Sequence, residues 1–89
     1  MAYNIKSAME ILSEILKKEE QEVELIDSNS NLETYGLESI EAIKLVVSLE
    51  EAYDFEFRDE DLIFDKFNTI NKLLNLLDGY LGNREEELI

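Results

Sequence analysis

The sequence predicts an all-α domain, a small four-helix bundle with a long loop between the first and second helices and a short third helix. Apolar residues recur at the spacing of an amphipathic helix in three segments, roughly residues 4–18, 39–53 and 69–77. The chain has 89 residues, 45% of them hydrophobic, which suits one compact core and leaves no room for a second domain. Strand-like alternation is confined to residues 54–57, too short and isolated for a sheet.

The first helix is expected over about Asn4–Lys18, where one broad face is apolar and Ser13 falls on the polar side. A charged run over residues 17–22 should end this helix and begin a long solvated connection. Residues 27–31 favour a turn, because Asp, Ser and Asn side chains hydrogen-bond to their own backbone. The apolar anchors available to the connection are Val23, Leu25, Ile26, Leu32 and Tyr35.

The second helix is expected over Ser39–Tyr53, with Gly36 in the turn before it and Ser39 as its N-cap. The start of a helix carries partial positive charge, so a phosphate ester on Ser39 would lie where anions are stabilised. The side chains expected to face the core are Leu45, Val46, Leu49 and Tyr53. A second apolar strip, Ile40, Ile43 and Val47, lies nearer Ser39 and is either exposed for a partner or simply part of the core.

The remaining residues predict a brief third helix over about Arg58–Phe64, with Asp59 as its N-cap and Phe57 buried before it. A final helix should be capped by Asn68 or Thr69. Its apolar stripe is Ile70, Leu73, Leu74 and Leu77, and the glycines that end it are Gly79 and Gly82. We place the domain at residues 1–82 and expect residues 83–89 to form a flexible tail.

The composition excludes several functional classes. Histidine and cysteine are both absent, which removes the commonest general base, thiolate nucleophiles and the usual zinc ligands, and argues against an autonomous enzyme. Eight basic and twenty-two acidic residues give a net charge of −14, which disfavours nucleic acid and favours proteins with basic surfaces. A membrane-spanning helix needs about 18 consecutive apolar residues, and the sequence has no such run. No signal peptide is evident either. We therefore expect a cytoplasmic protein that does not bind membranes.

A calcium site in the long loop is an alternative hypothesis. Oxygen-bearing side chains occupy positions 1, 3, 5, 7, 9 and 12 of a twelve-residue loop, namely Asp27, Asn29, Asn31, Glu33, Tyr35 and Glu38. An EF-hand also needs glycine at position 6 for its sharp turn, and that position is Leu32. The pattern is therefore a weak match to a calcium loop.

Two motifs resemble the central part of acyl and peptidyl carrier proteins. The first is Gly36-Leu37-Glu38-Ser39-Ile40, similar to the family pattern Gly-x-Asp-Ser-Leu. The second is Leu49-Glu50-Glu51-Ala52-Tyr53-Asp54-Phe55-Glu56-Phe57, similar to Leu-Glu-Glu-x-Phe-Gly-x-x-Ile. The resemblance extends from about Leu32 to Leu77, and the first helix fits more loosely. Two departures from the pattern bear on function: Glu38 replaces the usual Asp, and Lys44 lies where many fatty-acid carriers have an acidic residue.

The resemblance implies that a phosphopantetheinyl transferase moves 4′-phosphopantetheine from coenzyme A onto Ser39, which is surrounded by Gly36, Leu37, Glu38 and Ile40. The thiol of this arm then holds an acyl or aminoacyl group as a thioester. The family docks its partners through the second helix. In this chain that implies a docking face of Ile40, Glu41, Ile43, Lys44, Val47, Glu50 and Glu51. The implied partners are the transferase and acyl- or aminoacyl-loading and condensing enzymes with basic docking surfaces, and the carrier is expected to be a monomer without catalytic residues.

Three functions from different classes remain open. The leading hypothesis is a discrete carrier protein, and Glu38 and Lys44 favour specialised biosynthesis of the polyketide or nonribosomal-peptide type over fatty-acid synthesis. The second is an acidic helical interaction module that is never modified. The third is the calcium-binding loop protein.

Overall fold

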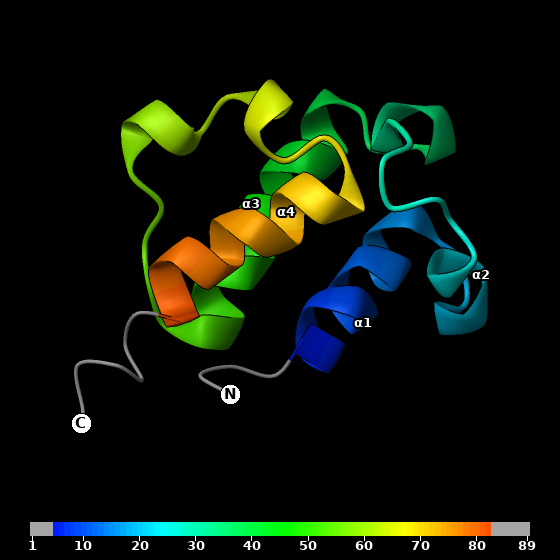
Figure 1. Ribbon diagram of the computed structural model, residues 1–89, viewed down its shortest axis with the longest axis horizontal. Coiled ribbons are helices and arrows are strands. Elements are labelled where there is room, and N and C mark those ends of the chain that lie inside the picture. Colours follow the sequence, from blue (N-terminus) through cyan, green and yellow to red (C-terminus); the bar gives the residue numbers. More distant parts are fainter. Residues whose placement is uncertain (1–4, 83–89) are drawn as a thin grey trace.

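The all-α prediction is confirmed by the computed structural model, which describes residues 5–82 (Figure 1). The α-helices are α1 (Ile5–Leu16), α2 (Glu20–Glu24), α3 (Ser39–Tyr53) and α4 (Ile70–Leu77). Three 3₁₀ turns, Leu32–Tyr35, Asp59–Asp61 and Phe64–Lys66, lie in the connections, and a π-helical turn, Asp78–Gly82, follows α4. Residues 5–82 contain no strand. The tail predicted at residues 83–89 lies outside the described residues.

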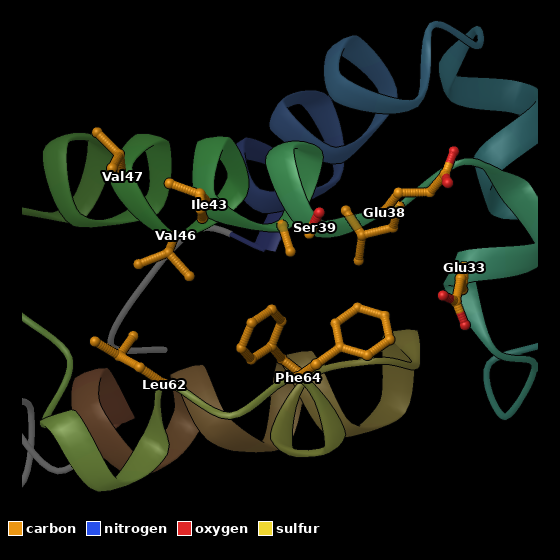
Figure 2. A pocket seen from close by; sticks show the side chains of 11 residues that line it. Glu33, Glu38, Ser39, Ile43, Val46, Val47, Leu62 and Phe64 are labelled. Carbon is orange, nitrogen blue, oxygen red and sulfur yellow. The ribbon is translucent and has the colours of Figure 1, made fainter.

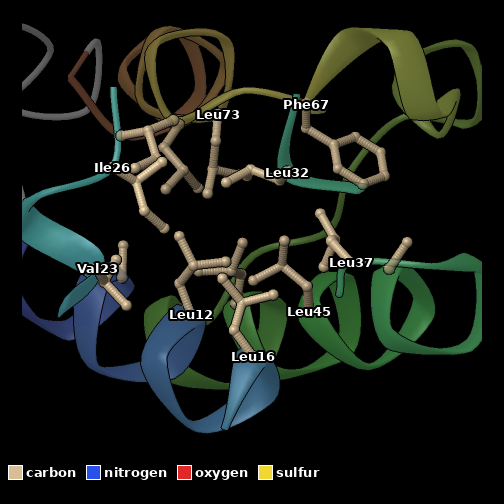
Figure 3. Packing of buried hydrophobic residues seen from close by; sticks show 14 of the residues in the cluster. Leu12, Leu16, Val23, Ile26, Leu32, Leu37, Leu45, Phe67 and Leu73 are labelled. Carbon is tan, nitrogen blue, oxygen red and sulfur yellow. The ribbon is translucent and has the colours of Figure 1, made fainter. Parts of the chain in front are cut away.

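The core lies where α1, α3 and α4 meet, and it consists largely of leucine (Figure 3). Each of the three helices supplies leucines at helical spacing, and the loop before α3 adds two more. The leucines with little or no exposed surface are Leu12, Leu16, Leu32, Leu37, Leu45, Leu49, Leu73, Leu77 and Leu81. Burying each leucine contributes about 1.5–3 kcal/mol relative to leaving it exposed, so this set dominates the packing energy.

Helix α1 ends two residues earlier than predicted, in a C-terminal cap that uses lysine where glycine is usual. Lys17 has a left-handed backbone (φ 57°), its N–H donates to the Glu14 carbonyl (3.2 Å), and the Lys18 N–H donates to the Ser13 carbonyl (3.0 Å). This is the Schellman arrangement, which turns the chain away from the helix axis. Ser13, predicted on the polar side, is instead buried, and its hydroxyl donates to the Glu10 carbonyl (2.7 Å).

The charged run after α1 is more ordered than predicted, because α2 begins within it. The Glu19 N–H donates to the Glu22 carboxylate (3.0 Å), which satisfies a backbone donor at the start of this short helix. Val23 and Ile26 are buried as expected, and they dock the helix on the core. Leu25, expected as a third anchor, is 85% exposed, because the chain turns between the two buried residues and leaves it on the outside.

The connection from α3 to α4 forms an arch on the outside of the helices (Figure 1). Phe57 is buried in an extended turn, as predicted. The third helix predicted over Arg58–Phe64 is replaced by the two 3₁₀ turns, because the backbone is extended at Ile63 (φ −115°, ψ 129°) and helical hydrogen bonding stops there. Arg58, not Asp59, occupies the N-cap position of the first turn, and its side chain makes no cap hydrogen bond.

Helix α4 is capped by Thr69, one of the two predicted residues, whose hydroxyl accepts from the Lys72 N–H (3.1 Å). Gly79, predicted to end the helix, does not do so. The chain continues through the π-helical turn to Gly82, and Leu81 within that turn is buried in the core. The side chain of Leu81 therefore holds the turn in place after the α-helical bonding has ended.

We predict that Lys17→Gly stabilises the domain by about 1 kcal/mol, because glycine adopts the left-handed backbone without the steric cost that a Cβ atom adds. Urea unfolding followed by circular dichroism measures this change. Lys18→Gly is the matched control: it removes the same charge at the next position, where the backbone is not left-handed, and should not stabilise. Equal midpoints for Lys17→Gly and the parent protein would contradict the prediction.

Candidate functional site

The loop before α3 is fixed by two fully buried leucines on either side of Gly36. The Leu32 N–H donates to the Asn68 carbonyl (2.8 Å) next to α4, and the Leu37 N–H donates to the Leu32 carbonyl (3.1 Å). Between them Gly36 has φ 110°, a conformation that L-residues rarely adopt. A Cβ atom at Gly36 would meet nothing closer than Leu16 Cδ2 at 4.0 Å. Glycine is therefore required here by the backbone and not by lack of space.

The sequence suggested that Ser39 is the N-cap of α3, and this prediction was wrong. Ser39 is the first residue of the helix. The N-cap is Glu38, whose backbone is extended (φ −95°, ψ −177°) and whose carbonyl accepts from the Ala42 N–H (2.7 Å). The Glu38 side chain makes no cap hydrogen bond. The Ser39 side chain is exposed, and we find no hydrogen bond from its hydroxyl to any residue in 5–82. This hydroxyl is therefore exposed and is not used for capping.

The backbone around Ser39 suits an anion. The first helical hydrogen bond of α3 comes from the Ala42 N–H, so the amides of the three preceding helical residues have no acceptor within the described part of the chain. These amides and the helix dipole favour a negative group at the start of α3. A phosphate ester on the Ser39 oxygen would lie at this end of the helix.

An apolar groove of about 520 Å³ begins at Ser39 and runs along α3 (Figure 2). One wall is the exposed side of α3, and the other is the arch that carries the two 3₁₀ turns. In Figure 2 Leu62 and Phe64 face Val46 and Ser39 across this space. The lining residues are Glu33, Leu37, Glu38, Ser39, Ala42, Ile43, Val46, Val47, Leu62, Phe64 and Phe67. This groove was not predicted from the sequence. The signal for it was the run of apolar residues Leu62, Ile63 and Phe64, of which Leu62 and Ile63 are exposed.

The second apolar strip on α3 is exposed to solvent. The sequence alone had left open whether it was exposed or part of the core. Ile40, Ile43 and Val47 are 63%, 64% and 46% exposed, and Ile43 and Val47 also line the groove. Lys44 lies among them, is exposed, and forms no ion pair with any residue in 5–82. These four side chains of the expected docking face are therefore exposed, and their use by a partner stays a prediction.

The acidic residues of the expected docking face differ in their surroundings. Glu51 is exposed and Glu41 is half-buried. The Glu50 carboxylate is half-buried and accepts from the Phe57 N–H (2.9 Å), so it closes the turn after α3. Glu51 and Glu41 are thus the carboxylates available to a partner, whereas Glu50 already has a structural contact.

Two side chains of the candidate calcium loop already accept hydrogen bonds from nearby backbone amides. Asp27 Oδ1 accepts from the Asn29 N–H (2.9 Å), and Asn31 Oδ1 accepts from the Glu33 N–H (2.9 Å), so both oxygens stabilise local turns. The amide of Asn71 in α4 donates to Asn29 Oδ1 (3.2 Å). Among the described residues no group of three or more acidic side chains is arranged to hold a metal ion.

None of the helices in residues 5–82 is long and apolar enough to span a bilayer.

We predict that Glu38→Asp stabilises α3 by about 0.5–1 kcal/mol, because the shorter carboxylate can accept from an amide of the first turn, which the Glu38 side chain does not do. The measurement is the free energy of urea unfolding. Glu41→Asp, the same chemical change inside the helix, is the control and should bring no gain. A loss of stability in Glu38→Asp would show that the N-cap geometry differs from the one described.

Two comparisons with known proteins show the family of this chain. A family profile described as a phosphopantetheine attachment site matches residues 7–77, which is most of the chain. The chain is also 27% identical over 82 residues to the acyl carrier protein of Buchnera aphidicola subsp. Schizaphis graminum, covering 92% of this chain and 94% of that protein. The chain therefore belongs to the phosphopantetheine-attachment family of carrier proteins, whose members carry a 4′-phosphopantetheine group and work with a phosphopantetheinyl transferase and acyl-handling enzymes.

Proposed function

We propose that this chain carries biosynthetic intermediates as thioesters on a 4′-phosphopantetheine arm attached to Ser39. The observation that carries the proposal is an exposed serine hydroxyl, without a hydrogen bond in the described residues, at the start of α3 and at the end of an apolar groove. The residues present fit the group: amides at the start of the helix suit the phosphate, and the groove suits an apolar cargo. When attached, the arm supplies a terminal thiol that forms the thioester.

The attachment step needs little from the chain itself. Ser39 Oγ attacks the phosphorus of coenzyme A that bears pantetheine; the new O–P bond forms as the phosphoanhydride bond breaks, and adenosine 3′,5′-bisphosphate leaves. The serine proton passes to a base of the transferase as the new bond forms. Ser39 contributes an accessible oxygen, and the first turn of α3 contributes a fixed orientation and favourable backbone dipoles.

The groove indicates the kind of cargo. Its walls are almost entirely apolar, and the two carboxylates that line it, Glu33 and Glu38, lie at the Ser39 end (Figure 2). An acyl chain with an apolar portion would lose contact with water by entering the space beside Val46 and Leu62. We infer that the intermediates include such a portion.

The pathway is proposed from two side chains. Lys44 places a cation in the docking face, and Glu38 replaces the aspartate of the family pattern; both support a carrier of the polyketide, nonribosomal-peptide or another specialised type. A carrier for fatty-acid synthesis is the second candidate, and the similarity to a bacterial acyl carrier protein favours it. In either case the chain is a carrier for other enzymes and performs no catalysis itself.

The docking face is proposed to be the exposed strip Ile40, Ile43 and Val47, with Glu41 and Glu51 beside it and Lys44 within it. Apolar side chains at the centre of such a surface supply affinity, and charges at its edge guide the encounter. With a net charge of −14, the carrier should meet enzymes that present a basic surface.

The attachment proposal is tested by intact-mass measurement after incubation with coenzyme A and a broad-specificity phosphopantetheinyl transferase. The parent protein should gain the mass of one phosphopantetheine group, and Ser39→Ala should gain none. Ser48→Ala, a change of the same type nine residues further along α3, should be modified like the parent. An unmodified parent protein would favour the interaction-module hypothesis, and modification of Ser39→Ala would place the site elsewhere.

The docking proposal predicts that Ile43→Gln lowers the kcat/KM of the transferase about tenfold, because an apolar anchor is lost while the net charge is unchanged. The helical signal should not change, since Ile43 is largely exposed. Leu25→Gln removes a side chain that is even more exposed and lies outside α3, and it should leave kcat/KM at the parent value. Equal rates for all three proteins would exclude Ile43 from the docking surface.

A further inference from the structure

The groove wall opposite α3 is a segment with few anchors of its own. Phe57 and Phe67 are buried at its two ends, but no side chain between them is fully buried, and Ile63 is 53% exposed. The backbone hydrogen bonds in this segment are local: the Asp61 N–H donates to the Arg58 carbonyl, and the Lys66 N–H donates to the Ile63 carbonyl. These bonds shape the two turns without fixing their distance from α3.

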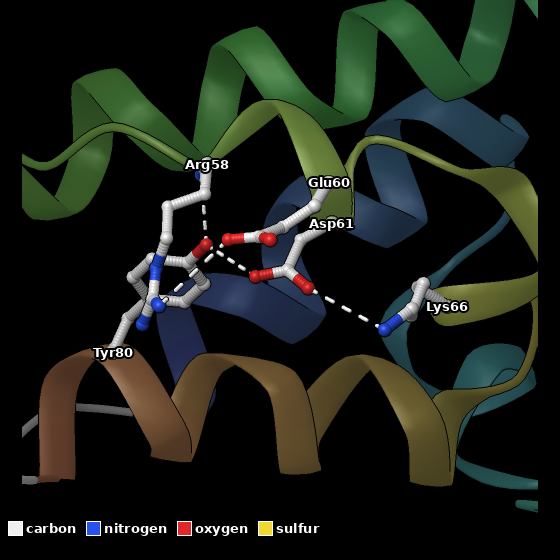
Figure 4. A network of polar contacts seen from close by, with 5 residues as sticks. All are labelled: Arg58, Glu60, Asp61, Lys66 and Tyr80. Atoms are coloured by element: carbon white, nitrogen blue, oxygen red, sulfur yellow. Dashed lines mark hydrogen bonds and ion pairs between the residues drawn. The ribbon is translucent and has the colours of Figure 1, made fainter.

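Tyr80 connects this segment to the turn that follows α4 (Figure 4). Its hydroxyl donates to Asp61 Oδ2 (2.5 Å) and accepts from the Arg58 N–H (2.8 Å). The Arg58 guanidinium lies 5.5 Å from the centre of the Tyr80 ring, and that ring packs against Phe55 and Phe57 with centroids 5.3 Å away. Among residues 58–66 we find no other hydrogen bond to a different element of the described chain.

The same network reaches the second turn of the wall. Asp61 Oδ1 lies 3.6 Å from Lys66 Nζ, so one carboxylate joins Tyr80 to the turn that contains Phe64. The hydrogen bond from Tyr80 is the main reason that the pKa of Asp61 lies below its ordinary value, with the charges of Lys66 and Arg58 acting in the same direction. Burial and the bond to Asp61 raise the pKa of Tyr80. The bonded state, with Asp61 ionised and Tyr80 protonated, is therefore the one that the fold favours near neutral pH.

We propose that Tyr80 is a positioning residue for the groove: by holding Arg58 and Asp61, its hydroxyl sets the distance of Leu62 and Phe64 from α3. Leu62 follows Asp61 directly, and its N–H closes the same 3₁₀ turn on Asp59 (3.1 Å), so a displacement of Asp61 moves Leu62 with it. The width of the groove then determines how large an apolar group it admits. The claim about the size of the admitted group rests on the proposed carrier function. The claim that Tyr80 sets the width of the groove does not.

The width is measured by electron paramagnetic resonance between two nitroxides. The chain contains no cysteine, so labels attached at Lys44→Cys on α3 and Ile63→Cys on the wall report this one distance. Both side chains are exposed, and neither lines the groove. In the labelled full chain we expect a narrow distance distribution. Tyr80→Phe, which keeps the ring and removes only the hydroxyl, should broaden it and shift it to longer distances.

Two further variants make the result specific. Tyr53→Phe also removes a hydrogen-bonded tyrosine hydroxyl, one that contacts Ala8 and Ser7 of α1, and it should leave the distribution unchanged. Asp61→Ala removes the acceptor but leaves Arg58 bonded to Tyr80, so it should give a smaller shift in the same direction, and it serves as the test if Tyr80→Phe loses its helical circular dichroism. A distribution that is the same in the parent and in the folded variant would overturn the proposal.

The consequence for cargo is tested on protein loaded with octanoyl-phosphopantetheine by the transferase. If the groove shields the thioester, the octanoyl thioester on Tyr80→Phe should hydrolyse roughly two- to tenfold faster than the one on the parent protein. This range matches the loss of one hydrogen bond. Tyr53→Phe should match the parent. Failure of Ser39 to load would count against the carrier function and leave the distance measurement intact. Equal hydrolysis rates together with a widened groove would refute only the link to cargo.

Discussion

The burial of Leu32 and Leu37 is the constraint on which the rest of the site depends. These two side chains enter the core on either side of Gly36, so the chain between them must reverse within a few residues, and the left-handed backbone at Gly36 allows it to do so. The hydrogen bond from Leu32 to Asn68 joins the same loop to the start of α4. The first residue of α3 is thus located by contacts with both other long helices, and its hydroxyl faces outward because Glu38 has already taken the N-cap position.

Helix α3 serves two surfaces at once. Leu45 and Leu49 face the core, whereas Ile43 and Val47 line the groove and its edge, so apolar residues occupy more of this helix than a single buried stripe requires. An exposed apolar surface next to an opening of about 520 Å³ is unusual for a domain of this size, unless another molecule or a bound group covers it. The abundant acidic residues keep such a surface soluble, because like charges resist association between copies of the chain.

The sequence predicted the features that depend on regular periodicity. The bounds of α3, the burial of Phe57 and the Thr69 cap followed from helical spacing and local chemistry. The short α2 was missed because five mostly acidic residues present no apolar stripe, and only Val23 fixes them to the core. The predicted N-cap, Ser39, lies one residue after the true N-cap, Glu38. The prediction relied on serine being a common capping residue, whereas the backbone angles of Glu38 decide where the helix begins.

The groove and its support could not be predicted from the sequence, because they depend on contacts between distant residues. Leu62 and Phe64 appeared to continue a helix, and their position opposite α3 follows only from the fold. Tyr80 was similarly indistinct, since it lies just after a glycine that seemed to end α4, and its partners are 19 and 22 residues away along the chain. Periodicity describes one element at a time and is silent about such pairs.

The π-helical turn at Asp78–Gly82 positions Tyr80 against the arch. Within this turn Leu81 enters the core while the Tyr80 hydroxyl accepts from the Arg58 N–H. Gly82, at the end of this turn, lies only two positions after Tyr80. An affinity tag or fused protein joined directly at that glycine would pull on the turn and disturb the hydroxyl. Fusions should therefore begin several residues further along or be placed at the other terminus.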